Sequence, residues 1–406
     1  MGKATKKREL GSRLTTLWRV ACSAVLVVGL VPAAAAAGTG QNFKALYTFS
    51  GGADGGTPTA PLVQDAAGNL YGTTESGGTG INGTVFKLDT RGKEKVLYNF
   101  TGGADGGSPW AGLVLDSQGN LYGTTFGGGN FNCGVIFKLS KNGKETVLYS
   151  FTGGSDGRGL FAGLVLDTGG NLFGAAAYGG ASDFGTVFKL DARGQFNVLH
   201  TFMGGADGEY PYSDLMLDQA GNLYGTTYGG GTSSSGTVFI LDKTGKETVL
   251  YSFSGGADGA SPWGALVRDG AGNLYGTAFY GGARSCEAPY GCGVVFKLDT
   301  TGKLKVLHKF TGGDGANPTS GVALDAAGNL YGTTNRDGSR ECPESGCGTI
   351  FKLSPAGKAK LLHNFTGKAD GANPWAGLLW DAKGKLCGTT YGGGGSNAGV
   401  VFRLDP

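Results

Sequence analysis

The sequence predicts an all-β protein, a seven-bladed β-propeller of four-stranded blades. Three observations predict it: one unit repeats seven times, each unit contains four strand-like runs, and the two chain ends complement each other. The repeat is marked by Gly-Asn-Leu-Tyr-Gly-Thr or a close variant, with copies 51, 51, 51, 51, 56 and 56 residues apart. A fixed period of this size is typical of repeat architectures. The second residue of the marker is Asn69, Asn120, Asn171, Asn222, Asn273, Asn329 and, in the last copy, Lys385.

The first element in chain order is a predicted secretory signal peptide, residues 1–37. A basic front precedes the apolar run 20–31, and Pro32 and the alanines of 33–37 follow it, which is the order of regions in such a peptide. The apolar run is shorter than the roughly 20 residues of a membrane-spanning helix. We therefore expect a mature domain of residues 38–406, without membrane attachment, in the periplasm or outside the cell.

The charge balance changes once the signal peptide is removed. That segment holds six of the 34 basic residues and one of the 31 acidic residues, which leaves 28 against 30 and a net charge near −2. Such a balance predicts no general attraction for nucleic acid. The mature domain is expected to be a monomer.

Each unit is expected to form four short antiparallel strands, as the second unit illustrates. An inner strand is predicted over 111–115 and a second over 121–125, with a turn sequence between them. A glycine-rich loop leads to a third strand over 134–139, and Asn142-Gly143 turns the chain into the outer strand, 146–151. The runs are almost continuously apolar, as expected for strands that neighbouring blades cover on both faces.

A glycine recurs inside the second strand of every unit. Glycine within a strand indicates the close approach of another group, and we expect that group to be an aromatic ring from the next blade. The glycines are Gly72, Gly123, Gly174, Gly225, Gly276, Gly332 and Gly388.

The chain ends predict that the ring closes. The mature chain starts with an outer-type strand, Phe43–Phe49, and finishes with a third-type strand, Val400–Leu404. Pairing these two strands completes a seventh blade and hides two sheet edges. An open β-solenoid, the alternative, leaves both edges unpaired.

The whole unit resembles a known repeat. The runs Phe-Thr-Gly-Gly-Ala-Asp-Gly, Leu-Val-Leu-Asp-x-x-Gly-Asn-Leu-Tyr-Gly-Thr-Thr and Gly-Thr-Val-Phe-Lys-Leu-Asp are similar to the tandem repeats of the bacterial GloVer family of choice-of-anchor proteins. The resemblance covers about residues 43–406 and implies an exported bacterial repeat protein of unknown biochemical role. We expect the chain to differ from that family in lacking a C-terminal sorting tail. The inner hairpin also resembles, more weakly, those of propeller lactonases and a streptogramin-type lyase.

The three histidines are predicted to be structural. His200, His308 and His363 occupy outer-strand positions that the sister units fill with tyrosine. The resemblance to the lyase therefore carries no catalytic residue onto this chain. Neither a Ser-His-Asp arrangement nor a histidine-ligated metal is expected.

Two rings of aspartates are predicted to close loops. The first begins the inner hairpin turns, where the side chain bonds its own backbone, and the second lies in the Gly-Gly-Ala-Asp-Gly loops. Calcium is the alternative for the second ring, but each loop has one carboxylate, whereas calcium takes six to eight oxygen ligands. We therefore expect no metal or other cofactor. The first ring is Asp65, Asp116, Asp167, Asp218, Asp269, Asp325 and Asp381; the second is Asp54, Asp105, Asp156, Asp207, Asp258, Asp314 and Asp370.

Four cysteines are predicted to form two disulfides. The pairs Cys286–Cys292 and Cys342–Cys347 flank insertions in the fifth and sixth units, and close pairs in an exported chain predict disulfides. A zinc site built from all four is the alternative and requires the two loops to meet. Cys133 has no nearby partner, and Cys387 is expected to be a buried thiol.

The most suggestive functional feature is the position directly before the inner strand of each unit, called the ring position below. Five units carry an aromatic residue there. We expect the ring positions to lie at the mouth of the axis, on the face of the two insertions. Clustered rings commonly mark recognition surfaces, and sugars stack on them. The alternative is that each ring only packs between adjacent blades. The seven positions are Thr59, Trp110, Phe161, Tyr212, Trp263, Thr319 and Trp375.

These observations favour an exported, non-catalytic binding module for a glycan or another surface ligand. A propeller lyase or lactonase with a central metal is the second hypothesis. It requires polar residues near the axis that break the symmetry of the repeat. The alignment of units reveals two, Glu75 and Asn335. Other units have Phe126, Tyr228 and Tyr391 at the same position. A structural or adhesive scaffold that binds another protein is the third.

Overall fold

A computed structural model describes residues 43–286, 290–338, 342 and 346–406. The chain divides into two units, Met1–Gly40 and Gln41–Pro406, and the propeller lies in the second. The predicted signal peptide, residues 1–37, lies outside the described residues. Within the described part of the chain, no helix has the length and apolar character needed to cross a membrane.

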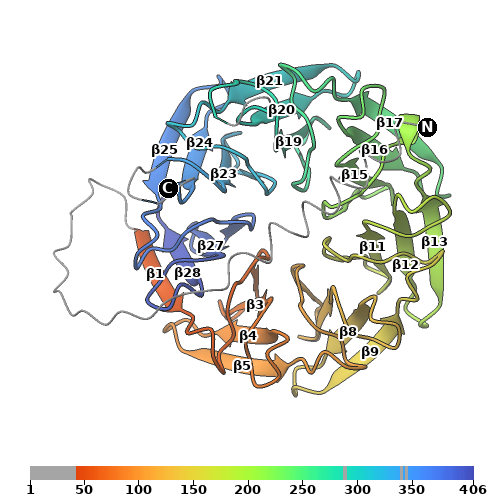
Figure 1. Cartoon of the computed structure of the whole chain (residues 1–406), viewed down its shortest axis with the longest axis vertical. Helices are drawn as coiled ribbons and strands as arrows, with labels where there is room; N and C mark the ends of the chain where they lie inside the picture. Colours follow the sequence, from red (N-terminus) through yellow and green to blue (C-terminus); the bar gives the residue numbers. More distant parts are fainter. Residues whose placement is uncertain (1–42, 287–289, 339–341, 343–345) are drawn as a thin grey trace, which may run out of the picture. The chain divides into compact units, whose positions relative to one another are not determined.

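The described residues form 28 strands in seven four-stranded antiparallel sheets, arranged as blades around an axis (Figure 1). The strands follow from the inside of each blade outward.

Blade 1 contains β2 (Val63–Gln64), β3 (Leu70–Thr74), β4 (Thr84–Leu88) and β5 (Glu94–Asn99). Blade 2 contains β6 (Val114–Leu115), β7 (Leu121–Thr124), β8 (Val135–Leu139) and β9 (Glu145–Ser150). Blade 3 contains β10 (Val165–Leu166), β11 (Leu172–Ala176), β12 (Thr186–Leu190) and β13 (Phe196–Thr201). Blade 4 contains β14 (Met216–Leu217), β15 (Leu223–Thr227), β16 (Thr237–Leu241) and β17 (Glu247–Ser252). Blade 5 contains β18 (Val267–Arg268), β19 (Leu274–Ala278), β20 (Val294–Leu298) and β21 (Leu304–Lys309). Blade 6 contains β22 (Ala323–Leu324), β23 (Leu330–Thr334), β24 (Thr349–Leu353) and β25 (Ala359–Asn364). Blade 7 contains β26 (Leu379–Trp380), β27 (Leu386–Thr390), β28 (Val400–Leu404) and β1 (Phe43–Thr48). A short 3₁₀ turn, η1 (Gly205–Asp207), follows blade 3.

The ring closes as the chain ends predict. Strand β1 pairs with β28, from Phe43 opposite Leu404 to Thr48 opposite Val400, and Figure 1 shows the red first strand beside the blue last one. At the axis, the Thr389 hydroxyl of blade 7 donates to the Ala60 carbonyl ahead of blade 1, at 3.2 Å. The prediction of seven blades with a shared last blade is confirmed, and the open solenoid is wrong.

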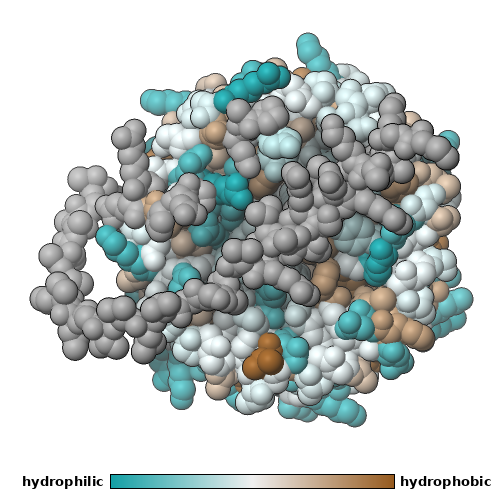
Figure 2. Space-filling model, viewed as in Figure 1, coloured by the Kyte–Doolittle hydropathy of each residue, from teal (hydrophilic) through white to brown (hydrophobic). Residues whose placement is uncertain are grey.

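The core lies between the blades. At each junction, a buried phenylalanine that follows the outer strand of one blade meets a phenylalanine on the third strand of the next. Phe49 and Phe86 lie 5.1 Å apart at the closing junction, and Phe253 and Phe296 lie 5.2 Å apart at the junction of blades 4 and 5. On the face seen in Figure 2 the visible described atoms are mostly pale or hydrophilic, with hydrophobic residues in small groups. The buried phenylalanines at these junctions hold one blade to the next.

The strand glycines are crowded by an aromatic ring, but the ring comes from the same blade. Gly72 is paired with Phe86 across β3 and β4, and a Cβ added at Gly72 would lie 2.7 Å from the Phe86 Cζ atom and 2.9 Å from the Leu62 Cδ2 atom. The expectation of a ring from the next blade was therefore wrong. The strand register places this phenylalanine over the glycine, and its ring then reaches the neighbouring blade.

The innermost strands are shorter than predicted. In the second unit, the run 111–115 contributes only β6, Val114–Leu115, to the sheet. The Ala111 carbonyl instead accepts a hydrogen bond from the Thr73 hydroxyl of blade 1, at 3.1 Å. Residues ahead of the inner strand thus bond across blades, which brings them to the axis.

Candidate functional site

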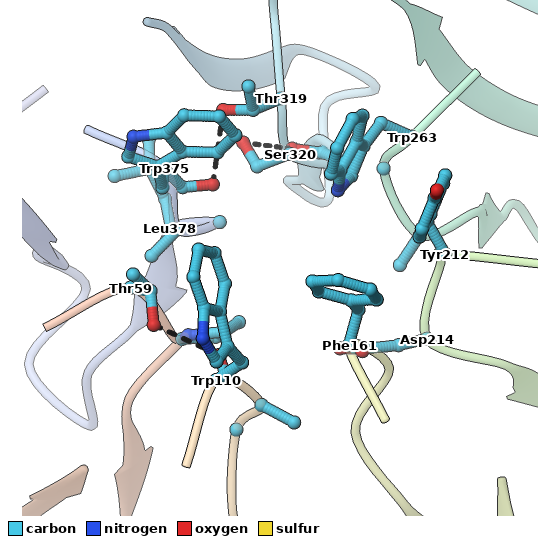
Figure 3. A pocket seen from close by; sticks show the side chains of 18 of the residues that line it. Thr59, Trp110, Phe161, Tyr212, Asp214, Trp263, Thr319, Ser320, Trp375 and Leu378 are labelled. Atoms are coloured by element: carbon cyan, nitrogen blue, oxygen red, sulfur yellow. Dashed lines mark hydrogen bonds between the residues drawn. The ribbon is translucent and has the colours of Figure 1, made fainter. Parts of the chain in front are cut away.

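The residues that precede the inner strands surround the axis and line one cavity of about 230 Å³ (Figure 3). Trp110, Phe161, Tyr212, Trp263 and Trp375 all line it, and Thr59 and Thr319 complete the ring. The five predicted aromatic residues are therefore brought together by five different blades.

Proline positions these side chains in six of the seven units, because it directly precedes the ring position. Pro109, which precedes Trp110, packs on the backbone of blade 1, since a Cβ added at Gly83 would lie 2.7 Å from the Pro109 Cδ atom. Only glycine leaves room for this contact, and Gly83 also has a φ of 90°, which glycine adopts without strain. The junction between blades thereby sets the direction in which the aromatic residue enters the axis.

The aromatic rings contact one another in sequence around the axis. Trp110 meets Phe161 at 5.6 Å between ring centroids, and Phe161 meets Tyr212 at 5.1 Å, both edge to face. Tyr212 stacks on Trp263 at 4.7 Å with an angle of 11° between the planes, and Trp263 meets Trp375 at 6.0 Å. The rings thus form a continuous wall rather than a set of isolated contacts between blades.

The hydroxyl groups of this wall are used within the protein. The Thr59 hydroxyl donates to the Trp110 carbonyl at 3.1 Å, and the Thr319 hydroxyl donates to the Trp375 carbonyl at 3.2 Å. The Tyr212 hydroxyl lies 2.7 Å from the Tyr178 hydroxyl. These groups tie adjacent blades together and leave the cavity mainly aromatic.

One carboxylate, Asp214, lines the same cavity, and the alignment of units missed it (Figure 3). Its Oδ1 atom accepts the Gly163 N–H at 2.5 Å. Burial raises the pKa of Asp214, an effect that the hydrogen bond from Gly163 opposes. No hydrogen bond to the Oδ2 atom is present among the described residues. The other units hold glycine, alanine or proline at this position, two residues after the ring position: Pro61, Gly112, Gly163, Ala265, Gly321 and Gly377.

The two polar oddities seen in the sequence lie beside the cavity rather than in its lining. Glu75 and Asn335 directly follow the second strands of blades 1 and 6, where Tyr228 of blade 4 packs 5.6 Å from Trp263. Burial raises the pKa of Glu75 to about 7. Among the described residues, the buried Glu75 Oε2 and Asn335 Nδ2 atoms have no hydrogen-bond partner. Both residues occur in the blades that carry threonine directly before the inner strand, Thr59 and Thr319, although Trp263 and Trp375 still meet across the second of these positions.

The outer aspartates close their loops, as predicted. Asp54 Oδ2 accepts the Tyr47 hydroxyl and the Ser50 N–H, each at 2.9 Å. His308 replaces that tyrosine in blade 5, and its Nε2 atom lies 2.7 Å from Asp314 Oδ2. The histidines therefore lie on the outer strands, beside these loops.

The inner aspartates cap their hairpins. Asp65 Oδ1 accepts the N–H groups of Ala67 and Asn69, at 3.0 and 2.9 Å. Within the described part of the chain, no group of three or more His, Cys, Asp or Glu side chains is arranged to hold a metal ion.

Both predicted disulfides are present. Cys286–Cys292 joins Cα atoms 5.3 Å apart, and Cys342–Cys347 joins Cα atoms 5.7 Å apart, so the alternative of a zinc site from these four residues is wrong. Cys133 and Cys387 are free thiols; Cys387 is buried, and burial raises its pKa. The bridge between Ala260 and Tyr280 places the first insertion at the end of blade 5 from which Trp263 enters the axis.

Comparison with known proteins gives a family and a fold. A family model described as the Gloeobacter/Verrucomicrobia repeat matches residues 35–239 and 216–406. No curated protein matches the chain. Similar solved structures include the extracellular domain of a protein described as a hybrid two-component system from B. thetaiotaomicron, with a TM-score of 0.60 and 12% identity. A second is the GH74 enzyme of Niastella koreensis, with a TM-score of 0.58 and 14% identity. The alignments cover 89% of this chain in both cases, but 39% and 53% of those chains, so the likeness concerns the propeller fold.

Proposed function

The chain belongs to the Gloeobacter/Verrucomicrobia repeat family, and on that premise we propose that it is an exported, non-catalytic binding module whose ligand enters the axial cavity. The observation that carries this proposal is the convergence of five aromatic residues from five blades on one cavity. Ligand sites are concave, predominantly apolar and lined by aromatic side chains, with a small number of polar groups. This cavity has that character.

The size of the cavity restricts the ligand. Its volume of about 230 Å³ is many times the roughly 10–15 Å³ that a single enclosed water needs. A small molecule fits that space, as does one terminal group of a larger glycan or surface ligand. Extended stretches of a polymer would have to lie outside the cavity, across the face that carries the two disulfide-bonded insertions.

Export is part of the proposal. Disulfides form and persist in oxidising compartments, and this chain has two. Together with the signal peptide predicted for residues 1–37, they favour the periplasm or the cell exterior, where a glycan or a surface protein is available as a partner.

The test uses residues 38–406 on a broad glycan and metabolite array, beside a variant with Trp110, Trp263 and Trp375 each changed to Ala. Trp380→Ala is the matched control, because Trp380 packs on Tyr331, 5.0 Å away, and is not part of the cavity lining. We expect binding by the wild type and the control, and its loss in the triple variant while the melting temperature shows a folded protein. Equal binding by the folded triple variant would refute the axial site.

Asp214 favours the second hypothesis, an enzyme, because it lies in the cavity lining itself. A carboxyl group whose pKa is raised by burial can serve as a general acid, and Asp214 lines the cavity. The corresponding test is hydrolysis of a panel of sugar lactones with and without divalent cations. Turnover that Asp214→Asn abolishes would replace the binding module with an enzyme.

A further inference from the structure

Among the small ligands considered above, the polar side chains of the cavity favour one that needs few hydrogen bonds. The hydroxyls of Thr59, Thr319 and Tyr212 already have partners within the protein. A sugar that enters an aromatic cavity leaves its water behind, so its hydroxyls need several replacement partners. Asp214 is the carboxylate of the lining, and its Oδ2 atom accepts no hydrogen bond from the described residues.

The charge of the cavity selects for a cation. Asp214 is an acidic residue in the lining, and the lining residues include no Lys, Arg or His. A carboxyl group shielded from water and without a counter-charge shifts toward its neutral form, and a cation bound beside it would favour the carboxylate again. Aromatic rings add to the same preference, because their faces carry negative charge density that attracts a cation placed within about 6 Å.

Size and coordination select the kind of cation. An inorganic divalent cation requires several oxygen ligands, and one carboxylate supplies few of them. A methylated ammonium group needs no ligands of that kind, because its methyl groups pack on aromatic surfaces while its charge is spread over them. Its volume is compatible with a cavity of about 230 Å³.

We propose that the axial cavity recognises a quaternary ammonium group, with the wall of Trp110, Phe161, Tyr212, Trp263 and Trp375 as its cage and Asp214 as its counter-charge. This inference rests on the proposed function, because it names the ligand class of the same site. The group is carried either by a free small molecule or by a lipid headgroup, and the chemistry of recognition is shared.

The experiment measures binding of choline to residues 38–406 by calorimetry and by tryptophan fluorescence. The neutral probe is 3,3-dimethylbutan-1-ol, which has the shape of choline but a carbon in place of the charged nitrogen. Asp214→Asn is nearly isosteric, and its amide oxygen can still accept the Gly163 N–H. The matched control is Asp89→Asn, because Asp89 lies in the turn between β4 and β5, away from the cavity.

Choline is expected to bind about 10- to 100-fold more tightly than the neutral probe, and Asp214→Asn is expected to remove most of that difference. Vesicles of phosphatidylcholine, beside vesicles of phosphatidylglycerol, then separate a lipid headgroup from a free cation as the source. Equal affinity for choline and the neutral probe, or unchanged choline affinity in folded Asp214→Asn, would refute the recognition of a cation. Neither result would refute the proposed binding function. Failure of choline, the neutral probe and the array ligands alike would overturn both.

Discussion

Closure of the ring by β1 makes a quantitative prediction about Phe49. This side chain is fully buried and lies 5.1 Å from Phe86 of blade 1. Truncating a fully buried phenylalanine to alanine costs about 3–5 kcal/mol of unfolding free energy, through lost transfer energy and the cavity left behind. We therefore expect Phe49→Ala to cost about 3–5 kcal/mol, although the residue lies close to the start of the propeller.

The comparison that isolates closure is Phe253→Ala. Phe253 is also fully buried, and its contact with Phe296 at 5.2 Å joins two blades that are continuous in sequence. In a closed ring the two junctions are equivalent, so the two variants should lose similar stability; in an open array the terminal strand would fray and Phe49→Ala would cost little. Urea unfolding followed by circular dichroism measures both, with Phe131→Ala as the exposed control because Phe131 is 59% exposed. A Phe49→Ala midpoint equal to that of the wild type would refute the closure.

Three further predictions concern the packing, a buried acid and the insertions. Gly225→Ala should lower the unfolding free energy by about 1–3 kcal/mol, because the new Cβ would lie 2.6 Å from Phe239 Cζ; adding Phe239→Leu should recover part of the loss in urea unfolding, and a Gly225→Ala protein of unchanged stability would contradict this packing. The pKa of Glu75 is raised by burial from 4.5 to about 7, so folding favours its protonated form, and its contribution to stability is complete below pH 4.5 and lost as the pH rises through about 7. Glu75→Gln should therefore be more stable than the wild type at pH 8, by on the order of 1–3 kcal/mol, and equal to it near pH 4; stability curves that stay parallel over this range would count against the assignment. Replacing Cys286 and Cys292 with serine should lower the unfolding free energy by about 2 kcal/mol, since the disulfide closes a short loop; a melting temperature that neither this change nor a reducing agent affects would argue against the bond.

The repeat explains why the architecture was predictable. Seven aligned units define the four strands of a blade. The chain begins with an outer strand, Phe43–Phe49, and its last unit ends with a third strand, Val400–Leu404, so the sequence already indicates how the ring closes. The partner of the strand glycine was not predictable in the same way. Periodicity shows that something approaches Gly72, but the register of β3 against β4 decides that Phe86 of the same blade covers it.

The aromatic residues of the site were predicted from the alignment of units, whereas its carboxylate was not. Five aromatic residues at one position of the unit were visible in the alignment, because a recurring residue type at a recurring position is a pattern. Asp214 occurs once, at a position that the other units fill with small residues or proline. The search for singular polar residues that found Glu75 and Asn335 could have found it, but only the structure shows that it lines the cavity.

The sequence by itself determined the blade, its number, the closing strand, the disulfides and the ring of aromatic positions, because each of these is encoded locally and repeated or paired along the chain. The tertiary structure alone decided that the ring positions contact one another, that their hydroxyls are used between blades, and that Asp214 lies in the same cavity. The physical reason is that an axis is shared by residues from all seven units. Their distances from one another depend on how the blades pack, and no segment of the chain encodes that packing alone.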